Sequence, residues 1–159
     1  MSGDAKFEDA GEGPLRLKAE TAEDLTVISA LAQDAVTTVG DVAFARRHHR
    51  LALLLNRFRW EDRVAAERAG RAYERVRSLL VVESALAVRS SGLDTAQKDM
   101  VLSLLSLSFT PCEDGAGTLT LWLAGDGEIA VEVECLDVSL TDVTRPYVAP
   151  SGKAPGHAD

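Results

Sequence analysis

The sequence predicts an α+β fold in which a few helices pack against one mostly antiparallel β-sheet of about seven strands. Three observations predict it: many short segments alternate apolar and polar residues, the connections between them are short, and one clear amphipathic helix lies near the N-terminus. A chain of 159 residues is of single-domain size. We therefore expect one domain whose sheet is strongly curved or barrel-like.

The globular domain is expected to span residues 14–144. Residues 1–13 are acidic and glycine-containing, and residues 145–159 hold three prolines and two glycines, compositions typical of disordered tails. The N-terminus lacks the apolar core of a secretory signal. No apolar run approaches the roughly 20 residues of a membrane span. We expect a cytoplasmic protein that does not enter a membrane, with its two cysteines as free thiols.

A short strand near residues 15–19 is followed by a helix predicted over about 22–37. Thr21 is a suitable N-cap, and Asp24 stands three positions later, as in a capping box. Apolar residues then recur with helical spacing as far as Val36.

The middle of the chain predicts a hairpin and then a long strand. A polar turn at residues 46–49 leads into a strand over residues 50–60. Residues 51–55 are apolar on both faces, which is typical of a central strand. Residues 61–74 are charged and alanine-rich and predict a loop with some helical turns, before a strand over residues 76–88.

The last third of the chain predicts three more strands and a short helix. Alternation indicates a strand over about residues 100–110. Residues 117–135 form the clearest hairpin of the sequence, with Asp126 and Gly127 at its turn. Three apolar residues at helical spacing predict a closing helix over residues 136–143.

The charge of the chain is unevenly placed. The net charge is −8, yet the segment 46–77 holds ten arginines against four acidic residues, a net charge of +6 that leaves −14 for the rest. An acidic chain disfavours general binding of nucleic acids or anionic membranes. The sequence has no glycine-rich nucleotide loop, nucleophile elbow or zinc-protease motif, so no cofactor or metal is expected.

The candidate binding residues lie in the basic segment. They are Arg57, Arg59, Arg75, Arg77, Asn56 and Trp60. Arg57 and Arg59 share one strand face, about 7 Å apart at the rise of a strand, and we expect that face to meet solvent. Arg75 and Arg77 form a similar pair, and neighbouring guanidinium groups can bind carboxylate or phosphate bidentately.

Two alternatives remain open for these arginines: a solvated face, or pairing across the sheet with outward acidic residues. Those acidic residues are Glu128, Glu132 and Glu134.

Asn56 and Trp60 are expected on the opposite face of the same strand. Asn56 interrupts its apolar pattern, and a buried amide needs hydrogen-bond partners. The amide either satisfies a bulge or helix end, or lines a small cavity and contacts a ligand. Trp60 is of the type that anchors a core or the rim of a site.

Several segments carry a family resemblance. They are LLNRFRWE at 54–61, YERV at 73–76, AVRSSGLD at 87–94, VLSLLSLSF at 101–109 and VEVEC at 131–135. They resemble an uncharacterised bacterial family, mainly alphaproteobacterial, classed as a domain of unknown function. The resemblance covers about residues 15–143 and implies no activity, cofactor or catalytic residue.

We therefore expect a small cytosolic protein that acts by binding, with its Arg-rich face docking on the acidic surface of another protein. One alternative is a protein or enzyme that binds a small anionic metabolite, in a cavity near Asn56. Another is RNA or nucleotide binding through the same arginines, although the net charge of −8 weighs against it. The sequence does not indicate an oligomeric state.

Overall fold

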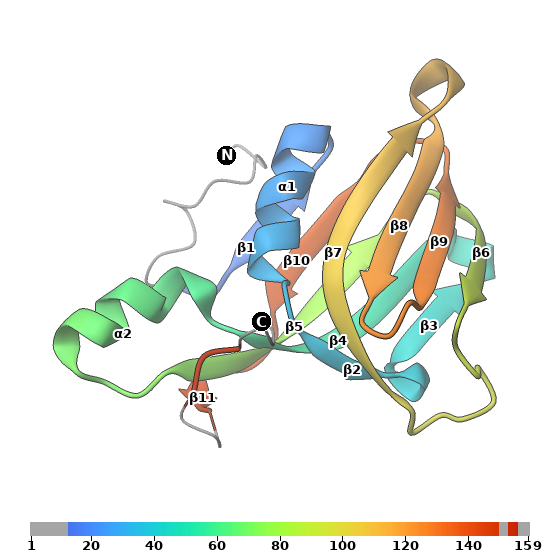
Figure 1. Cartoon of the computed structure of the whole chain (residues 1–159). Helices are drawn as coiled ribbons and strands as arrows, with labels where there is room; N and C mark the ends of the chain where they lie inside the picture. The colour runs from blue at the N-terminus through green and yellow to red at the C-terminus, as the bar shows by residue number, and fades with distance from the viewer. Residues whose placement is uncertain (1–12, 150–152, 156–159) are drawn as a thin grey trace.

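The computed structural model describes residues 13–149 and 153–155, and it shows an α+β fold (Figure 1). Within these residues, eleven strands form one antiparallel sheet. The strands are β1 Arg16–Ala19, β2 Val36–Thr38, β3 Val42–Ala45, β4 Arg50–Phe58, β5 Glu74–Val82, β6 Ala85–Ser91, β7 Val101–Pro111, β8 Gly117–Leu123, β9 Glu128–Val133, β10 Val138–Asp142 and β11 Tyr147–Val148. The helices are α1 Ala22–Leu31 and α2 Arg63–Ala69, with short 3₁₀ segments η2 Val39–Asp41, η3 Arg46–His48, η4 Trp60–Asp62 and η5 Glu113–Gly115.

The sheet is open and sharply curled. Its strand order is β1-β10-β5-β4-β2-β7-β8-β9-β6, with β3 added to β4 and β11 added to β5. Between β5 and β6 the chain turns a corner at Ser84, whose φ of 55° is left-handed. The consecutive strands β5 and β6 therefore lie in different halves of the sheet. β5 lies beside β4 and β10, and β6 lies beside β9 (Figure 1).

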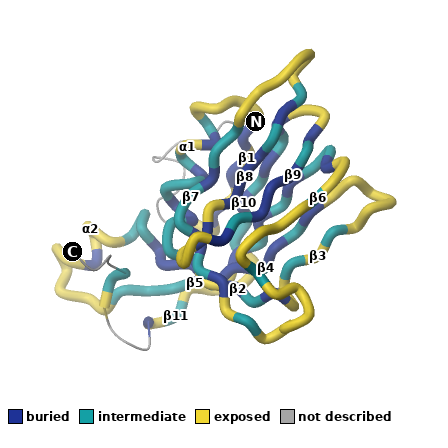
Figure 2. Tube along the Cα trace, turned by 45° about the vertical axis from the view of Figure 1, so that its right-hand side comes forward, coloured by how far each residue is buried: buried dark blue, intermediate teal, exposed yellow. Residues whose placement is uncertain are grey.

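One apolar core fills the space between the two halves. It joins leucines of β4 and β5 to those of β7 and β8, and α1 adds Leu25, Ile28 and Leu31 (Figure 2). Each fully buried leucine stabilises the fold by about 1.5–3 kcal/mol through removal of apolar surface from water. Side chains on the inner surface of the curled sheet therefore pack against one another in the core.

The predicted N-terminal helix is confirmed at its start and is too long at its end. The side chain of Thr21 accepts a hydrogen bond from the N–H of Asp24 at 3.1 Å, as an N-cap does. Helix α1 ends at Leu31, six residues before the predicted limit of 37. Asp34 adopts a left-handed φ of 63°, and the β-branched residues that follow form β2 between β4 and β7.

The predicted C-terminal helix over residues 136–143 is wrong, because this segment contains β10. That strand lies between β1 and β5. Val138 and Leu140 are buried and alternate with partly exposed Ser139 and Thr141. A spacing of four residues fits both a helix and a strand, so Leu136 and Leu140 could not decide between the two.

The described residues form eleven strands where the sequence predicted about seven, and the differences arise in a few particular segments. The sheet is open and does not close into a barrel. β2, β10 and β11 lie outside the segments predicted as strands, and the strand predicted over 76–88 is divided at the Ser84 corner. Helix α2 occupies part of the predicted loop and ends at Ala69, with Gly70 as its C-cap. The hairpin turn at 46–49 and the hairpin over 117–135 are confirmed, although the left-handed turn residues of the latter are Gly125 and Asp126.

The predicted tails fall mostly outside the described residues. Residues 1–12, 150–152 and 156–159 are not described. Within the segment 145–159, β11 pairs with β5, with Tyr147 opposite Arg75.

Candidate functional site

The expectation that Arg57 and Arg59 face solvent is wrong. Arg57 is 0% exposed and shares the inner face of β4 with Leu51, Leu53 and Leu55, while Arg59 is 7% exposed. Asn56 lies on the outer face, contrary to its predicted core position. Because residues 51–55 are apolar on both faces, the sequence pattern did not determine which face of β4 is buried.

Arg57 is the centre of a buried ionic network at the end of β4. Its Nη1 and Nη2 donate to the two carboxylate oxygens of Glu61, each at 2.8 Å. Nη2 also donates to Asp142 Oδ1 at 2.9 Å, and Nε donates to Ser78 Oγ at 2.9 Å. The side chains of Glu61 and Asp142 are only 2% and 4% exposed. These bonds join β4, β5 and β10 across the inner face.

The hydrogen-bonding capacity of Asp142 is also used within the network. Its Oδ1 accepts from Ser78 Oγ at 2.7 Å, and its Oδ2 accepts from the N–H of Leu15 at 2.8 Å. Burial lowers the pKa of Arg57, but the hydrogen bonds and charges of Glu61 and Asp142 outweigh burial and leave the pKa above the ordinary arginine value. The arrangement joins strands through hydrogen bonds between buried polar groups.

Arg59 belongs to a second ionic group beside the first. Its Nη1 donates to Glu74 at 2.6 Å, and it lies 3.6 Å from both Glu61 and Asp62. Asp62 accepts two hydrogen bonds from Arg71, at 2.8 and 3.0 Å. These hydrogen bonds are the main reason why the pKa of Asp62 is lowered.

The predicted alternative of pairing with the β9 glutamates is wrong for Arg57 and Arg59, whose partners lie on β5, β10 and η4. Glu132 pairs instead with Arg89, at 2.9 Å.

Arg75 and Asn56 form a different kind of contact on the outer face. Arg75 Nε donates to Asn56 Oδ1 at 2.6 Å, and Nη2 donates to the backbone oxygen of Asn56 at 2.8 Å. Both acceptors are neutral, and within the described residues no carboxylate lies within ion-pair distance of Arg75. Burial lowers the pKa of Arg75, with only partial compensation from the charges of Tyr147 and Asp34.

A cavity of about 380 Å³ opens beside this contact. Asn56 and Arg75 line it together with Asp34, Val36 and residues 153–155. Asn56 thus lines a cavity, which was one of the two alternatives for its amide.

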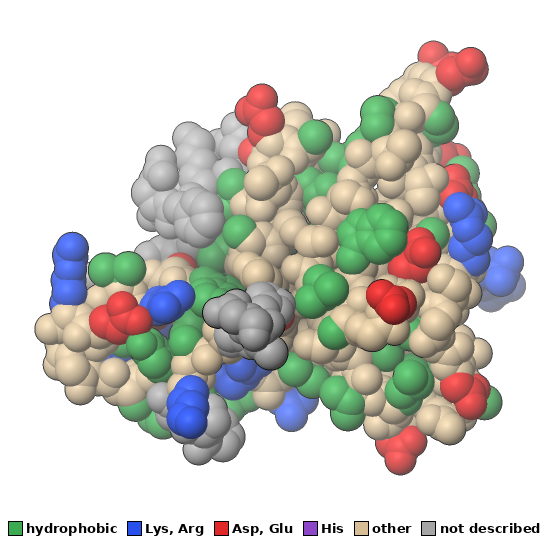
Figure 3. Space-filling view, viewed as in Figure 1, with side chains coloured by type: hydrophobic (Ala, Val, Ile, Leu, Met, Phe, Trp, Pro, Cys, Tyr) green, Lys and Arg blue, Asp and Glu red, His purple; other side chains and the backbone are tan. Residues whose placement is uncertain are grey.

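Arg77 extends this outer surface. It lies opposite Asn56 in the β4–β5 register, is exposed, and has no ion-pair partner within the part of the chain that the structure describes. We call Asn56, Arg75 and Arg77 the Arg75 surface. Figure 3 shows Lys and Arg side chains near α2, β5 and β11 and a second group at the right-hand edge of the view, with Asp and Glu side chains both near α2 and over the rest of this face.

Trp60 lies at the rim of the ionic groups and not on the Arg75 surface. Its Nε1 donates to the backbone oxygen of Gln33 at 3.0 Å. Its ring meets the edge of Phe58 with centroids 4.7 Å apart. The structure therefore brings Asn56, Arg75 and Arg77 together and separates them from Arg57, Arg59 and Trp60.

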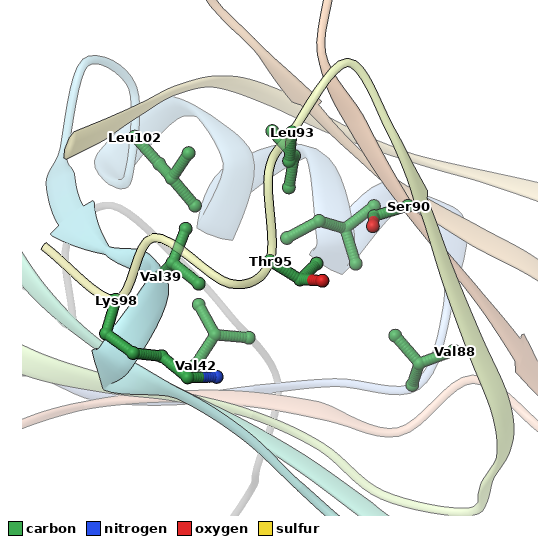
Figure 4. A pocket seen from close by; sticks show the side chains of 9 residues that line it. Val39, Val42, Val88, Ser90, Leu93, Thr95, Lys98 and Leu102 are labelled. Carbon is green, nitrogen blue, oxygen red and sulfur yellow. The ribbon is translucent and has the colours of Figure 1, made fainter. Parts of the chain in front are cut away.

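Sequence reasoning missed an apolar pocket of about 140 Å³ between η2, β6 and the loop that precedes β7 (Figure 4). Six of its lining residues are apolar: Val39, Val42, Val88, Leu93, Leu102 and Ile129. The polar residues are Ser90, Thr95 and Lys98. Because these residues come from distant segments, no local motif could have revealed the pocket.

The described residues hold no group of three potential metal-ligating His, Cys, Asp or Glu side chains. They also include no helix that is long and apolar enough to cross a bilayer.

Comparison with protein families gives one result. Residues 15–157 match the family described as Protein of unknown function (DUF2948). The chain belongs to the DUF2948 family. This confirms the resemblance noted in the sequence and adds no activity to it. Comparisons with curated proteins and with solved structures gave no match.

Proposed function

We propose that this DUF2948 protein acts by binding, and that an acidic segment of another protein docks on the Arg75 surface. One observation carries the proposal: within the described residues, the half-buried Arg75 guanidinium donates its hydrogen bonds to neutral oxygen atoms of Asn56, and the nearby charge of Asp34 offsets its burial only in part. By contrast, the buried Arg57 and Arg59 each have carboxylate partners.

A carboxylate fits this position for electrostatic reasons. Removing a charge from water costs free energy unless an opposite charge compensates it. The contacts to Asn56 use Nε and one N–H of Nη2, so the Nη1 side of the fork is still available to a ligand. A bidentate or single charge-assisted bond from an acidic side chain would supply the missing compensation. Exposed Arg77 would hold a second acidic group of the same segment.

The charge distribution of the whole chain supports the same kind of partner. The segment 46–77 carries a charge of +6 in a chain of net charge −8. The surface of this segment would therefore attract acidic partners. Such complementarity raises association rates and selects partners more than it raises affinity. We also propose a cytoplasmic location, since both cysteines are free thiols.

The test compares two double variants with equal charge change. Arg75→Glu/Arg77→Glu reverses the Arg75 surface, and Arg47→Glu/Arg68→Glu reverses two exposed arginines elsewhere. Tagged proteins are used to capture partners from bacterial lysate, and each captured protein is then purified and its affinity measured directly. We expect a partner that binds the wild type and the control variant and binds the Arg75 surface variant at least tenfold more weakly.

Equal affinity of every purified partner for the two double variants would overturn the proposal. Binding that is lost from the Arg75 surface variant but belongs to RNA would reassign the surface to nucleic acid. RNA binding would show a steep fall of affinity with salt.

A small anionic metabolite is the second candidate ligand, because the cavity of about 380 Å³ beside Asn56 and Arg75 has room for one. Titration with succinate and glutamate distinguishes the two. Saturable binding of either anion that Arg75→Gln abolishes would favour the metabolite, while no binding at millimolar anion would favour the protein partner.

A further inference from the structure

We propose that the apolar pocket beside Lys98 binds a small monocarboxylate, with its apolar part among the valines and its carboxylate at the Lys98 ammonium. The pocket shares no residue with the Arg75 surface. The inference therefore stands independently of the proposed function.

The size of the pocket limits the ligand. A cavity of about 150 Å³ lined by apolar side chains is known to hold a benzene-sized molecule, and this pocket measures about 140 Å³. The apolar part should therefore contain about five to seven carbon atoms. Val88 is one of the residues that line the pocket (Figure 4).

The polar groups of the pocket select a negatively charged head group. Lys98 extends along the pocket floor beside Val42, with its amino group directed inward (Figure 4). Within the described residues Lys98 makes no ion pair. The hydroxyl of Thr95 faces the same space and can donate a second hydrogen bond to a carboxylate oxygen. No acidic residue lines the pocket, so an amine would meet no counter-charge there.

The backbone around Lys98 is held in place before any ligand binds. The N–H of Gly40 donates to the carbonyl of Lys98 at 2.7 Å, and the N–H of Val39 donates to that of Met100 at 3.0 Å. A Cβ at Gly40 would lie 3.0 Å from the Lys98 carbonyl oxygen, which indicates how closely η2 and this loop approach. A fixed wall lowers the ordering cost of binding a small ligand.

The test uses hexanoate as the probe and follows the backbone amides of the full chain by NMR. We expect saturable shifts for residues that line the pocket. Lys98 is exposed, so Lys98→Met should weaken hexanoate binding by about two- to fivefold, the effect of losing one solvent-exposed charge pair. Lys18→Met is the matched control, because Lys18 is an exposed lysine of β1 outside the pocket, and it should leave the affinity unchanged. Val88→Phe should fill the pocket and abolish binding.

Three further measurements distinguish binding in this pocket from binding elsewhere on the chain and from apolar binding without charge selection. Arg75→Gln should leave hexanoate affinity unchanged, which distinguishes the pocket from the Arg75 cavity. Hexylamine and hexanamide should bind much more weakly than hexanoate. The proposal is overturned by equal binding of the three ligands, by shifts that map outside the pocket, or by no saturation up to about 10 mM, a weak limit even for a ligand of this size. The Lys98→Met result decides the matter even if Val88→Phe does not fold.

Discussion

Replacement of Arg57 by methionine tests whether the buried ionic network holds the sheet together. Methionine keeps much of the length and apolar volume of the arginine stem and removes only its charge and donors. The change leaves the carboxylates of Glu61 and Asp142, only 2% and 4% exposed, without the Arg57 guanidinium, and Glu61 keeps only the longer contact of 3.6 Å to Arg59. Four hydrogen bonds of 2.8–2.9 Å to Glu61, Asp142 and Ser78 disappear.

The expected cost is about 3–5 kcal/mol of unfolding free energy, the range for removing one partner of a buried ion pair. A loss of this size is a large fraction of the roughly 5–15 kcal/mol that stabilises a typical domain. Urea unfolding at pH 7, followed by circular dichroism and tryptophan fluorescence, measures it. Neutralising the acids as well, in Arg57→Met/Glu61→Gln/Asp142→Asn, should recover part of the loss because no uncompensated charge remains inside.

Arg63→Met is the control for losing an arginine without burial. Arg63 pairs with Glu67 at 3.1 Å, and both side chains are 46% exposed. An exposed pair of this kind stabilises a protein by about 0–1 kcal/mol. If Arg57→Met costs no more than Arg63→Met, the network does not stabilise the fold and the reasoning is refuted.

Two further predictions concern pH and close packing. Because Arg71 lowers the pKa of Asp62, the charge of Asp62 stabilises the fold above the ordinary aspartate pKa of about 3.9, and this stabilisation is lost as pH falls through the lower folded value. Asp62→Asn should therefore be less stable at pH 7 and lose less stability on acidification, and acid slopes equal to wild type in urea melts would contradict this. Gly117→Ala should cost about 1–3 kcal/mol or more, since its Cβ would overlap the backbone oxygen of Thr110 and lie 2.7 Å from the Phe109 ring. Gly70→Ala has open space at a φ of 64° and should cost about 1 kcal/mol; equal melting temperatures for the two variants would show that the Gly117 contact is relieved cheaply.

Local chemistry made parts of the fold predictable. Thr21 and Asp24 marked the start of α1, since an N-cap is a contact between residues three apart. The hairpin of β8 and β9 followed from strict alternation on both sides of a glycine-rich turn, and Ile129 and Val131 are buried as expected.

The burial of Arg57 could not be predicted, because its cause lies far along the chain. Asp142 is 85 residues away from Arg57, in a segment that the sequence pattern assigned to a helix. With LALLL apolar on both faces, the two faces of β4 looked equivalent, and an arginine is usually exposed. The Arg75 surface was partly foreseen, since Arg75 and Arg77 were paired from their spacing, but their proximity to Asn56 depends on the β4–β5 register.

The pairing of β1 with β10 has a consequence for the order in which the protein is made. Leu17 lies opposite Leu140, so the first strand has no neighbour on this side of the sheet until the tenth has been synthesised. At roughly 5–20 residues per second, Asp142 leaves the ribosome several seconds after Arg57. During that interval Arg57 can hydrogen-bond to Glu61 and Ser78, but the second carboxylate of its network is absent. A chain that ends before residue 142 therefore lacks both the strand partner of β1 and one of the two carboxylates that compensate the buried charge of Arg57.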